Sequence, residues 1–230
     1  MEEQSVNTRK LAAEKAVEYV KQGMIVGLGT GSTAYWAIQL LGSRVKQGLE
    51  IKSLATSTQS ELMAHELGIP IITFAETDHL DITIDGADET DESLNLIKGG
   101  GGALLREKIV GSATEFYIII ADESKLVNHL GSFPLPVEVV QFGSELSFRK
   151  LQTLGCSPRL RLTNNKPFVT DNGHFIFDCA CGYILEPDLL HQQLINIPGV
   201  VETGLFLNMA DIVILGNKDG GTRIIRKQAT

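Results

Sequence analysis

The sequence predicts an α/β fold, in which a Rossmann-like, largely parallel sheet forms one domain and a smaller α+β domain of ferredoxin-like type is inserted into it. Three observations favour this fold. Apolar runs alternate with amphipathic segments through the first half of the chain, as in strands joined by right-handed helical crossovers. Two prolines, Pro134 and Pro136, mark a change of pattern. A later apolar run at 211–216 predicts a strand that returns to the first sheet.

The elements of the first domain follow from two periodicities. Leu11, Ala16 and Val20 place apolar side chains on one face of a helix over 8–21. The run at 24–29 is apolar and ends in glycines, as expected of a buried parallel strand. The same patterns then predict helix 32–45, strand 51–56, helix 58–67, strands 70–74 and 80–85, helix 103–112 and strand 116–121.

The smaller domain is predicted from a shorter series of elements. Asp171-Asn172-Gly173 is a strong turn signal, which predicts a hairpin with arms at 168–170 and 174–177. Around it we expect strand 137–142, helix 143–154, strand 159–163, helix 187–196 and strand 200–207, an order that fits a split βαβ domain. The expected limits are therefore 1–130 and 206–230 for the sheet domain and 131–205 for the small domain.

Composition and charge restrict the class of protein. Hydrophobic residues make up 43% and charged residues 21% of 230 residues, which is typical of a globular protein. The net charge of −8 argues against nucleic acid as a partner, and no apolar run is long enough to span a bilayer. The start, Met1 to Gln4, shows no signal peptide. With three cysteines, Cys156, Cys179 and Cys181, we expect reduced thiols and a cytoplasmic location.

Polar loops follow four predicted strands, at 27–33, 56–59, 85–89 and 121–125. In an open parallel sheet the carboxyl ends of the strands form the ligand-binding edge, so these four loops predict a crevice. The first loop leads into a helix, whose free N–H groups favour an anion. We assign to this anion site the residues Thr30, Gly31, Ser32 and Thr33.

Three other interpretations of the first loop were weighed. A dinucleotide site is rejected, because Ser32 stands where the fingerprint needs glycine and the next strand ends in Ala55-Thr56-Ser57-Thr58 without an acid. A P-loop is rejected because no Gly-Lys-Ser/Thr follows. A tight turn with an N-cap serine and no ligand stays open.

Two further segments carry ionisable groups to the same edge. Asp85 and Asp88 flank Gly86-Ala87 directly after a predicted strand, where carboxylates cap turns, grip hydroxyl groups or move protons. Four consecutive glycines, 99–102, stand between Lys98 and a predicted helix, and their entropic cost favours a loop that wraps a ligand over a linker. Glu107 lies early in that helix, and its i−4 and i+4 neighbours Ala103 and Gly111 are small, which leaves its carboxylate room to face a pocket. A solvated charged face is the simpler interpretation of this position.

These motifs, in this order, resemble those of ribose-5-phosphate isomerase, type A. The resemblance covers nearly the whole chain and is most specific in the segment from Lys98 to Lys108 and in the stretch 133–139. It implies an aldose–ketose isomerase of the pentose phosphate pathway, which interconverts D-ribose 5-phosphate and D-ribulose 5-phosphate through an enediolate. It also implies no cofactor and a homodimer or higher homo-oligomer.

The resemblance assigns roles residue by residue. The general base falls on Glu107, and the other catalytic positions fall on Asp85, Asp88 and Lys98. Arg9 or Lys10 stands where the family often has a basic residue, and the sequence leaves open which of them reaches the phosphate. The residues expected to bind substrate are Thr30, Gly31, Ser32, Thr33, Asp85, Gly86, Ala87, Asp88, Lys98, Gly99, Gly100, Gly101 and Lys125.

Two alternatives share this architecture. A non-catalytic sugar-phosphate-sensing domain of a transcriptional regulator is expected to carry a DNA-binding helix-turn-helix segment, and none is predicted here. A coenzyme A transferase-like protein uses a glutamate as nucleophile, but such chains are much longer. No cluster of residues has the spacing of a metal site, so no metal is expected.

Overall fold

A computed structural model of the chain describes residues 7–227. The stretch from which no signal peptide is expected, Met1 to Gln4, lies outside the described residues. The centre of the fold is a six-stranded sheet in the order β15-β14-β6-β3-β1-β2, parallel except for the pair β14 and β15. Its strands are β1 (Ile25–Leu28), β2 (Lys52–Ala55), β3 (Leu80–Gly86), β6 (Thr114–Asp122), β14 (Ile212–Gly216) and β15 (Thr222–Arg226).

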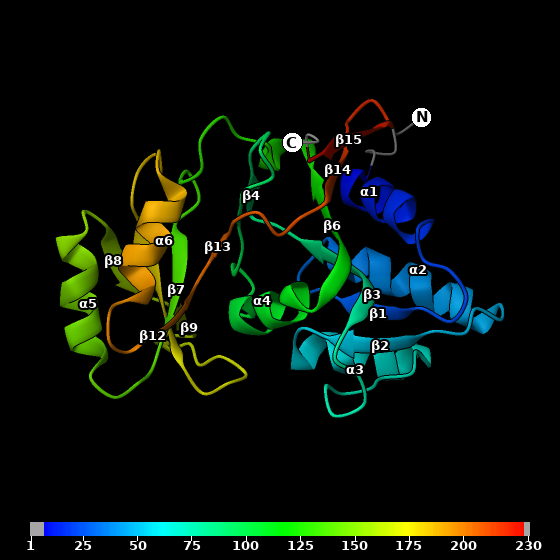
Figure 1. Cartoon of the computed structure of the whole chain (residues 1–230), viewed down its shortest axis with the longest axis horizontal. Coiled ribbons are helices and arrows are strands. Elements are labelled where there is room, and N and C mark those ends of the chain that lie inside the picture. The colour runs from blue at the N-terminus through cyan, green and yellow to red at the C-terminus, as the bar shows by residue number, and fades with distance from the viewer. Residues whose placement is uncertain (1–6, 228–230) are drawn as a thin grey trace.

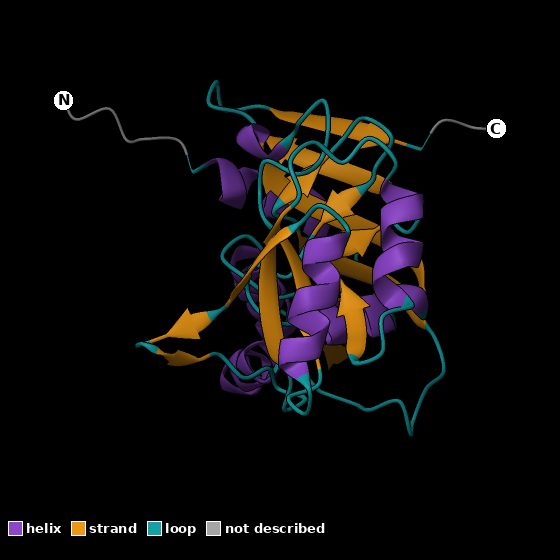
Figure 2. Ribbon diagram, turned by 90° about the vertical axis from the view of Figure 1, so that its left-hand side faces the viewer, coloured by secondary structure: helices purple, strands orange, loops and turns teal. Residues whose placement is uncertain are grey.

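Helices cover both faces of this sheet, which explains why its central strands β6 and β14 are mostly apolar and buried. On β6, Ile118 and Ile120 pack into one core cluster with helices α1 (Thr8–Val17) and α2 (Ala34–Lys46). Tyr117 and Ile119, which point the other way, pack into a second cluster that includes the first residue of helix α4 (Leu104–Ser112). Helix α3 (Thr58–Leu67) packs beside α2 and β2. The result is a three-layered α/β arrangement (Figures 1 and 2).

A second sheet forms the smaller lobe on the left of Figure 1. It is antiparallel in the order β12-β7-β11-β8. Helices α5 and α6 contribute to the core cluster on one face of it, and the connectivity βαββαβ with this strand order is that of a ferredoxin-like domain. Its elements are β7 (Leu135–Val139), α5 (Ser144–Thr153), β8 (Ser157–Leu160), β11 (Phe175–Ala180), α6 (Pro187–Ile195) and β12 (Val200–Thr203).

Short elements join the two lobes and extend from them; the sequence patterns predicted 162–163 and 205–206 only as the ends of longer strands and did not predict the others. A three-stranded sheet pairs β13 (Leu205–Phe206) with β5 (Leu96–Ile97), and β5 with β4 (Glu89–Thr90). A two-stranded ribbon of β9 (Leu162–Thr163) and β10 (Lys166–Pro167) projects from the small lobe (Figure 2). One turn of 3-10 helix, Glu123–Lys125, follows β6. These elements are too short for a periodic pattern to show.

Four strand predictions were wrong in detail. The segment 70–74 forms only one bridge, between Ile71 and Ser53, and is otherwise irregular. The predicted strand 159–163 is divided between β8 and β9, and the predicted strand 200–207 between β12 and β13. The turn before Gly173 is present, but 168–170 is not a strand, because β11 pairs instead with β7 and β8. Tertiary pairing therefore replaced the local hairpin. The domain limits stay a prediction.

The expectation of three reduced thiols was wrong for two of them. Cys156 and Cys181 form a disulfide, with Cα atoms 4.2 Å apart. The antiparallel register of β8 and β11 places Ser157 opposite Ala180, so the residues just beyond this pair face each other. Cys179 is free and buried.

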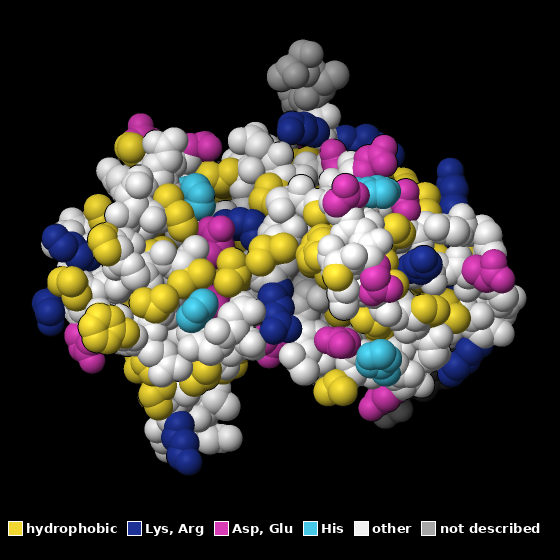
Figure 3. Space-filling model, turned by 60° about the horizontal axis from the view of Figure 1, so that its bottom comes forward, with side chains coloured by type: hydrophobic (Ala, Val, Ile, Leu, Met, Phe, Trp, Pro, Cys, Tyr) yellow, Lys and Arg dark blue, Asp and Glu magenta, His cyan; other side chains and the backbone are white. Residues whose placement is uncertain are grey.

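The surface in Figure 3 carries charges of both signs intermixed, without a broad basic area on that face. Among residues 7–227, no helix is long and apolar enough to cross a membrane.

Candidate active site

A pocket lies at the carboxyl ends of β1, β3 and β6, between the sheet and the glycine run that precedes α4. This is the edge at which the sequence patterns placed a crevice. It is bordered by residues from five separate segments of the chain: Arg9, Thr30, Gly31, Ser32, Thr33, Gly86, Ala87, Asp88, Lys98, Gly99, Gly100, Gly101, Glu107 and Lys125.

The loop after β1 borders this pocket, and hydrogen bonds on its buried side fix its position. The Thr30 N–H donates to Asp85 Oδ1 at 3.0 Å, and the Thr30 hydroxyl lies 2.7 Å from Thr56 Oγ1 and 2.8 Å from Ser57 Oγ. Thr30 therefore anchors the loop. Gly31, with φ of 101°, turns the backbone into α2. Just before α2, the N–H groups of Ser32 and Thr33 have no acceptor among the described residues, as an anion site requires.

Asp85 lies beneath the pocket and has no exposed surface. Its Oδ1 accepts from the Thr30 and Gly86 N–H groups, and its Oδ2 lies 3.1 Å from the Lys98 ammonium and 3.3 Å from the Tyr117 hydroxyl. A Cβ at Gly29 would come within 2.2 Å of Asp85 Oδ1, so only glycine fits there. Asp85 thus joins the anion loop to the lysine, and it is not among the residues that border the pocket.

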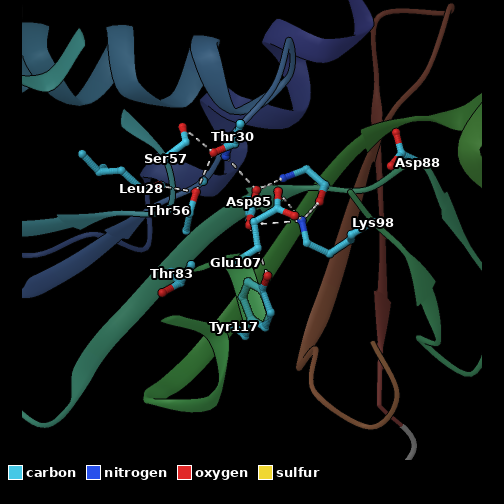
Figure 4. A network of polar contacts seen from close by, with 12 residues as sticks. Leu28, Thr30, Thr56, Ser57, Thr83, Asp85, Asp88, Lys98, Glu107 and Tyr117 are labelled. Carbon is cyan, nitrogen blue, oxygen red and sulfur yellow. Dashed lines mark hydrogen bonds and ion pairs between the residues drawn. The ribbon is translucent and has the colours of Figure 1, made fainter. Parts of the chain in front are cut away.

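Lys98 and Glu107 form the centre of the site (Figure 4). Lys98 is 1% exposed, and its ammonium donates to the Gly86 carbonyl and lies 3.3 Å from Glu107 Oε1. Glu107 is 5% exposed, and its Oε2 is buried without a hydrogen-bond partner among the described residues. A buried, unpaired carboxyl oxygen at the wall of a pocket is costly for stability, which makes it a candidate for chemistry.

The pKa values of this cluster are shifted by burial and by mutual charge. Burial raises the pKa of Glu107 to about 8; the Lys98 ammonium opposes this rise, whereas the carboxylates of Asp85 and Asp88 add to it. Burial alone would lower the pKa of Lys98, but Asp85 and Glu107 outweigh it, so the pKa is raised and the amine stays charged. Among the described residues, Asp85 lies within reach of four donors, whereas Glu107 lies within reach of the Lys98 ammonium alone.

Sequence reasoning missed Tyr117, which is fully buried in β6 under Asp85. Burial and the Asp85 charge raise the pKa of its phenol, so the hydroxyl stays a donor. A Cβ at Gly111 would lie 2.8 Å from the Tyr117 ring. The small size of Gly111 therefore makes room for Tyr117 and not, as the sequence suggested, for the Glu107 carboxyl. A tyrosine in a run of isoleucines was the available signal.

The remaining predicted residues lie on the open side of the pocket. Asp88 is set apart from the buried cluster (Figure 4), and its Oδ2 accepts from the Gly100 N–H at 2.7 Å. Arg9 donates to Ser32 Oγ at 3.1 Å, whereas Lys10 pairs with Glu14 outside the pocket. Of the two basic residues that the sequence left open, Arg9 is therefore the one at the site.

Such a site, on a Rossmann-like sheet, defines a class of enzyme that moves a proton within a small anionic substrate. Comparison with known proteins gives the family. The family model for ribose 5-phosphate isomerase A (phosphoriboisomerase A) matches residues 52–220. A ribose-5-phosphate isomerase A from Bacillus mycoides is 53% identical over 216 residues, covering 94% of this chain and 98% of that protein. One from Parvibaculum lavamentivorans is 51% identical over 224 residues, covering 94% and 96%.

Solved structures agree with this result. Ribose 5-phosphate isomerase from Plasmodium falciparum superposes with a TM-score of 0.93 at 38% identity, covering 96% of this chain and 98% of that one. A D-ribose-5-phosphate isomerase in complex with phospho-erythronic acid gives 0.91 at 39% identity, covering 95% and 97%. This chain belongs to the ribose 5-phosphate isomerase A family.

Proposed function

We propose that the chain interconverts D-ribose 5-phosphate and D-ribulose 5-phosphate through an enediolate, with Glu107 as the base. The observation that supports this most directly is the Glu107 carboxyl, which is buried and half unpaired beside the Lys98 ammonium. The names of the relatives support the same reaction. The carboxyl lines a pocket whose other side is the anion-ready loop, so one small sugar phosphate can reach both.

The chemistry needs one base that acts on two neighbouring carbons. The Glu107 carboxylate takes the proton from C2 of the open-chain aldose, and the C2 electrons form the enediolate. The same carboxyl returns the proton to C1, while a proton moves from O2 to O1, so the ketose is an isomer of the aldose. The Lys98 ammonium lies where it can stabilise the negative charge that develops on the oxygens.

Substrate binding falls to the open side of the pocket. Gly31, Ser32 and Thr33 offer backbone and hydroxyl donors for the phosphate, and Arg9 and Lys125 add positive charge. Since the protein as a whole carries a charge of −8, this local concentration of donors is what makes an anion site possible. Asp88 and the glycine run 99–101 border the part of the pocket left for the sugar hydroxyls.

The test is turnover of ribose 5-phosphate by the purified chain and by Glu107→Gln. We expect kcat to fall by roughly 10²- to 10⁴-fold, the usual contribution of a positioned base. The matched control is Glu14→Gln, because Glu14 is also a helical glutamate beside a lysine, at 3.6 Å, but is exposed. Near-normal kcat in Glu107→Gln would refute the assignment.

Assays on the same purified protein also distinguish the two alternative functions. A sugar-phosphate sensor binds ribose 5-phosphate without turnover, and a coenzyme A transferase forms a thioester on its glutamate with an acyl-CoA. In heavy water, a proton-transfer mechanism places solvent deuterium on the carbon beside the carbonyl, and a hydride shift places none. A homodimer or higher homo-oligomer, a cytoplasmic location and independence from metals and cofactors stay predictions.

A further inference from the structure

The glycine run of the active site is held from outside by a residue of the small lobe. Arg161 lies between β8 and β9, and its backbone is fixed to β11 by an N–H bond to the Ile176 carbonyl at 2.9 Å. Its Nη1 donates to the carbonyl of Gly99 at 2.8 Å and to that of Gly100 at 3.2 Å. Its Nε donates to Asp178 Oδ2 at 3.0 Å, and its Nη2 bonds to Asp178 Oδ1.

This contact determines where the glycine N–H groups point. A trans peptide is planar, so the N–H of one residue points away from the carbonyl of the residue before it. Because one nitrogen of Arg161 binds both carbonyls, the N–H groups of Gly100 and Gly101 both point away from Arg161. The Gly100 N–H meets Asp88, a residue at the border of the pocket. The Gly101 N–H has no acceptor within the described part of the chain, and Gly101 also borders the pocket.

Arg161 adds to two other bonds that hold the glycine run: the Gly102 N–H donates to the Gly99 carbonyl at 2.9 Å, and the Gly100 N–H donates to Asp88. Glycines lose more conformational freedom on folding than other residues, and Gly99 and Gly102 adopt positive φ angles of 102° and 83°. Asp178 supplies two bonds that hold the guanidinium in one orientation, a fork geometry that lysine cannot reproduce. The Arg161 side chain is 13% exposed and packs 5.8 Å from the centre of the Phe168 ring.

We propose that Arg161 is a positioning residue for the isomerisation: by binding the carbonyls of Gly99 and Gly100 it keeps the Gly100 N–H on Asp88 and turns the free Gly101 N–H toward the enediolate. The proposal rests on the proposed function. It gives the small lobe a part in the reaction. A donor held in place before charge develops stabilises a transition state more than one that must reorganise. Binding of the carbonyls by a cation also polarises the peptide groups and strengthens their N–H donors.

The experiment compares Arg161→Met with Arg159→Met. Arg159 is an exposed arginine of β8, opposite Asp178 in the strand register, and it forms no side-chain hydrogen bond within residues 7–227. We expect Arg161→Met to lower kcat by about 10- to 100-fold, which is less than the roughly 10²- to 10³-fold loss on removing an oxyanion donor, because the Gly101 N–H is misplaced and not removed. The KM for ribose 5-phosphate should change by less than about threefold, because the anion loop is untouched. Arg159→Met should match the wild type.

Two inhibitors separate positioning from general damage. Inorganic phosphate can bind only to the anion loop. Phospho-erythronic acid also carries a carboxylate at the reacting end, so its affinity depends on the glycine run as well. Arg161→Met should bind phospho-erythronic acid about 10-fold more weakly or worse and inorganic phosphate as the wild type does. Arg161→Lys, which keeps the charge but not the fork, should lose kcat in the same direction by a smaller factor.

Two results would overturn the proposal. One is equal kcat in Arg161→Met and Arg159→Met. The other is an equal loss of affinity for both inhibitors, which would mean that the whole pocket is disturbed. If Arg161→Met does not fold, Asp178→Asn replaces it in the same assays, because it removes one of the two oxygen acceptors that fix the Arg161 guanidinium. An inactive wild type contradicts the proposed function itself, so the two failures are distinguishable.

Discussion

Replacing Glu107 with glutamine is expected to stabilise the folded protein while it removes activity. The Glu107 pKa is about 8 in the folded protein, against an ordinary value of 4.5. A carboxyl with a raised pKa binds its proton more tightly when folded, so stability is lost as the pH rises from 4.5 toward 8. The loss amounts to roughly 1 kcal/mol at pH 5 and about 3 kcal/mol at pH 7. Glutamine, which is nearly the same size and never ionises, avoids it.

The measurement is urea unfolding of the wild type and of Glu107→Gln, followed by circular dichroism at pH 5 and pH 7. The difference in the free energy of unfolding should favour the variant and should grow with pH. Lys98 keeps its contacts to Asp85 and to the Gly86 carbonyl, so loss of the Glu107 contact leaves no charge unpaired. Glu14→Gln should show no such trend, because Glu14 is exposed. A variant that is no more stable than the wild type at pH 7 would refute this account of the Glu107 environment.

Three further outcomes are expected. Because the base must be ionised, kcat/KM should rise about tenfold from pH 7 to a plateau above about pH 9, with its midpoint at the Glu107 pKa of about 8. Asp88→Asn, which removes a charge that raises the Glu107 pKa, should move this midpoint to lower pH, and a flat profile would contradict the pKa. Lys98→Ala should lower kcat by on the order of 10²-fold or more, and a change confined to KM would assign Lys98 to ground-state binding. Arg9→Met should raise KM for ribose 5-phosphate more than it lowers kcat, as a steady-state assay will show, whereas Lys10→Met should leave both unchanged, since Lys10 lies outside the pocket.

Long, strongly patterned elements of the fold could be predicted from the sequence. The six strands of the central sheet include five that the sequence patterns predicted, and helix α3 occupies 58–67 as expected. Strand β15 and the two-residue strands β4 and β5 were not predicted, and β13 was predicted only as the end of a longer strand. A run of two residues carries no readable period, and pairing is what makes it a strand, as when Ile97 of β5 pairs with Leu205, which is distant in the sequence.

The sequence by itself determined the family and the set of residues at the carboxyl edge of the sheet, because glycine runs and loop carboxylates are local features. Only the tertiary structure decided what each residue does there. It placed Asp85 beneath the pocket, selected Arg9 over Lys10 and brought Arg161 and Tyr117 to the site from distant segments of the chain. It also buried Glu107 beside Lys98. Burial and charge neighbours set a pKa, and both exist only once segments far apart in the chain have packed together.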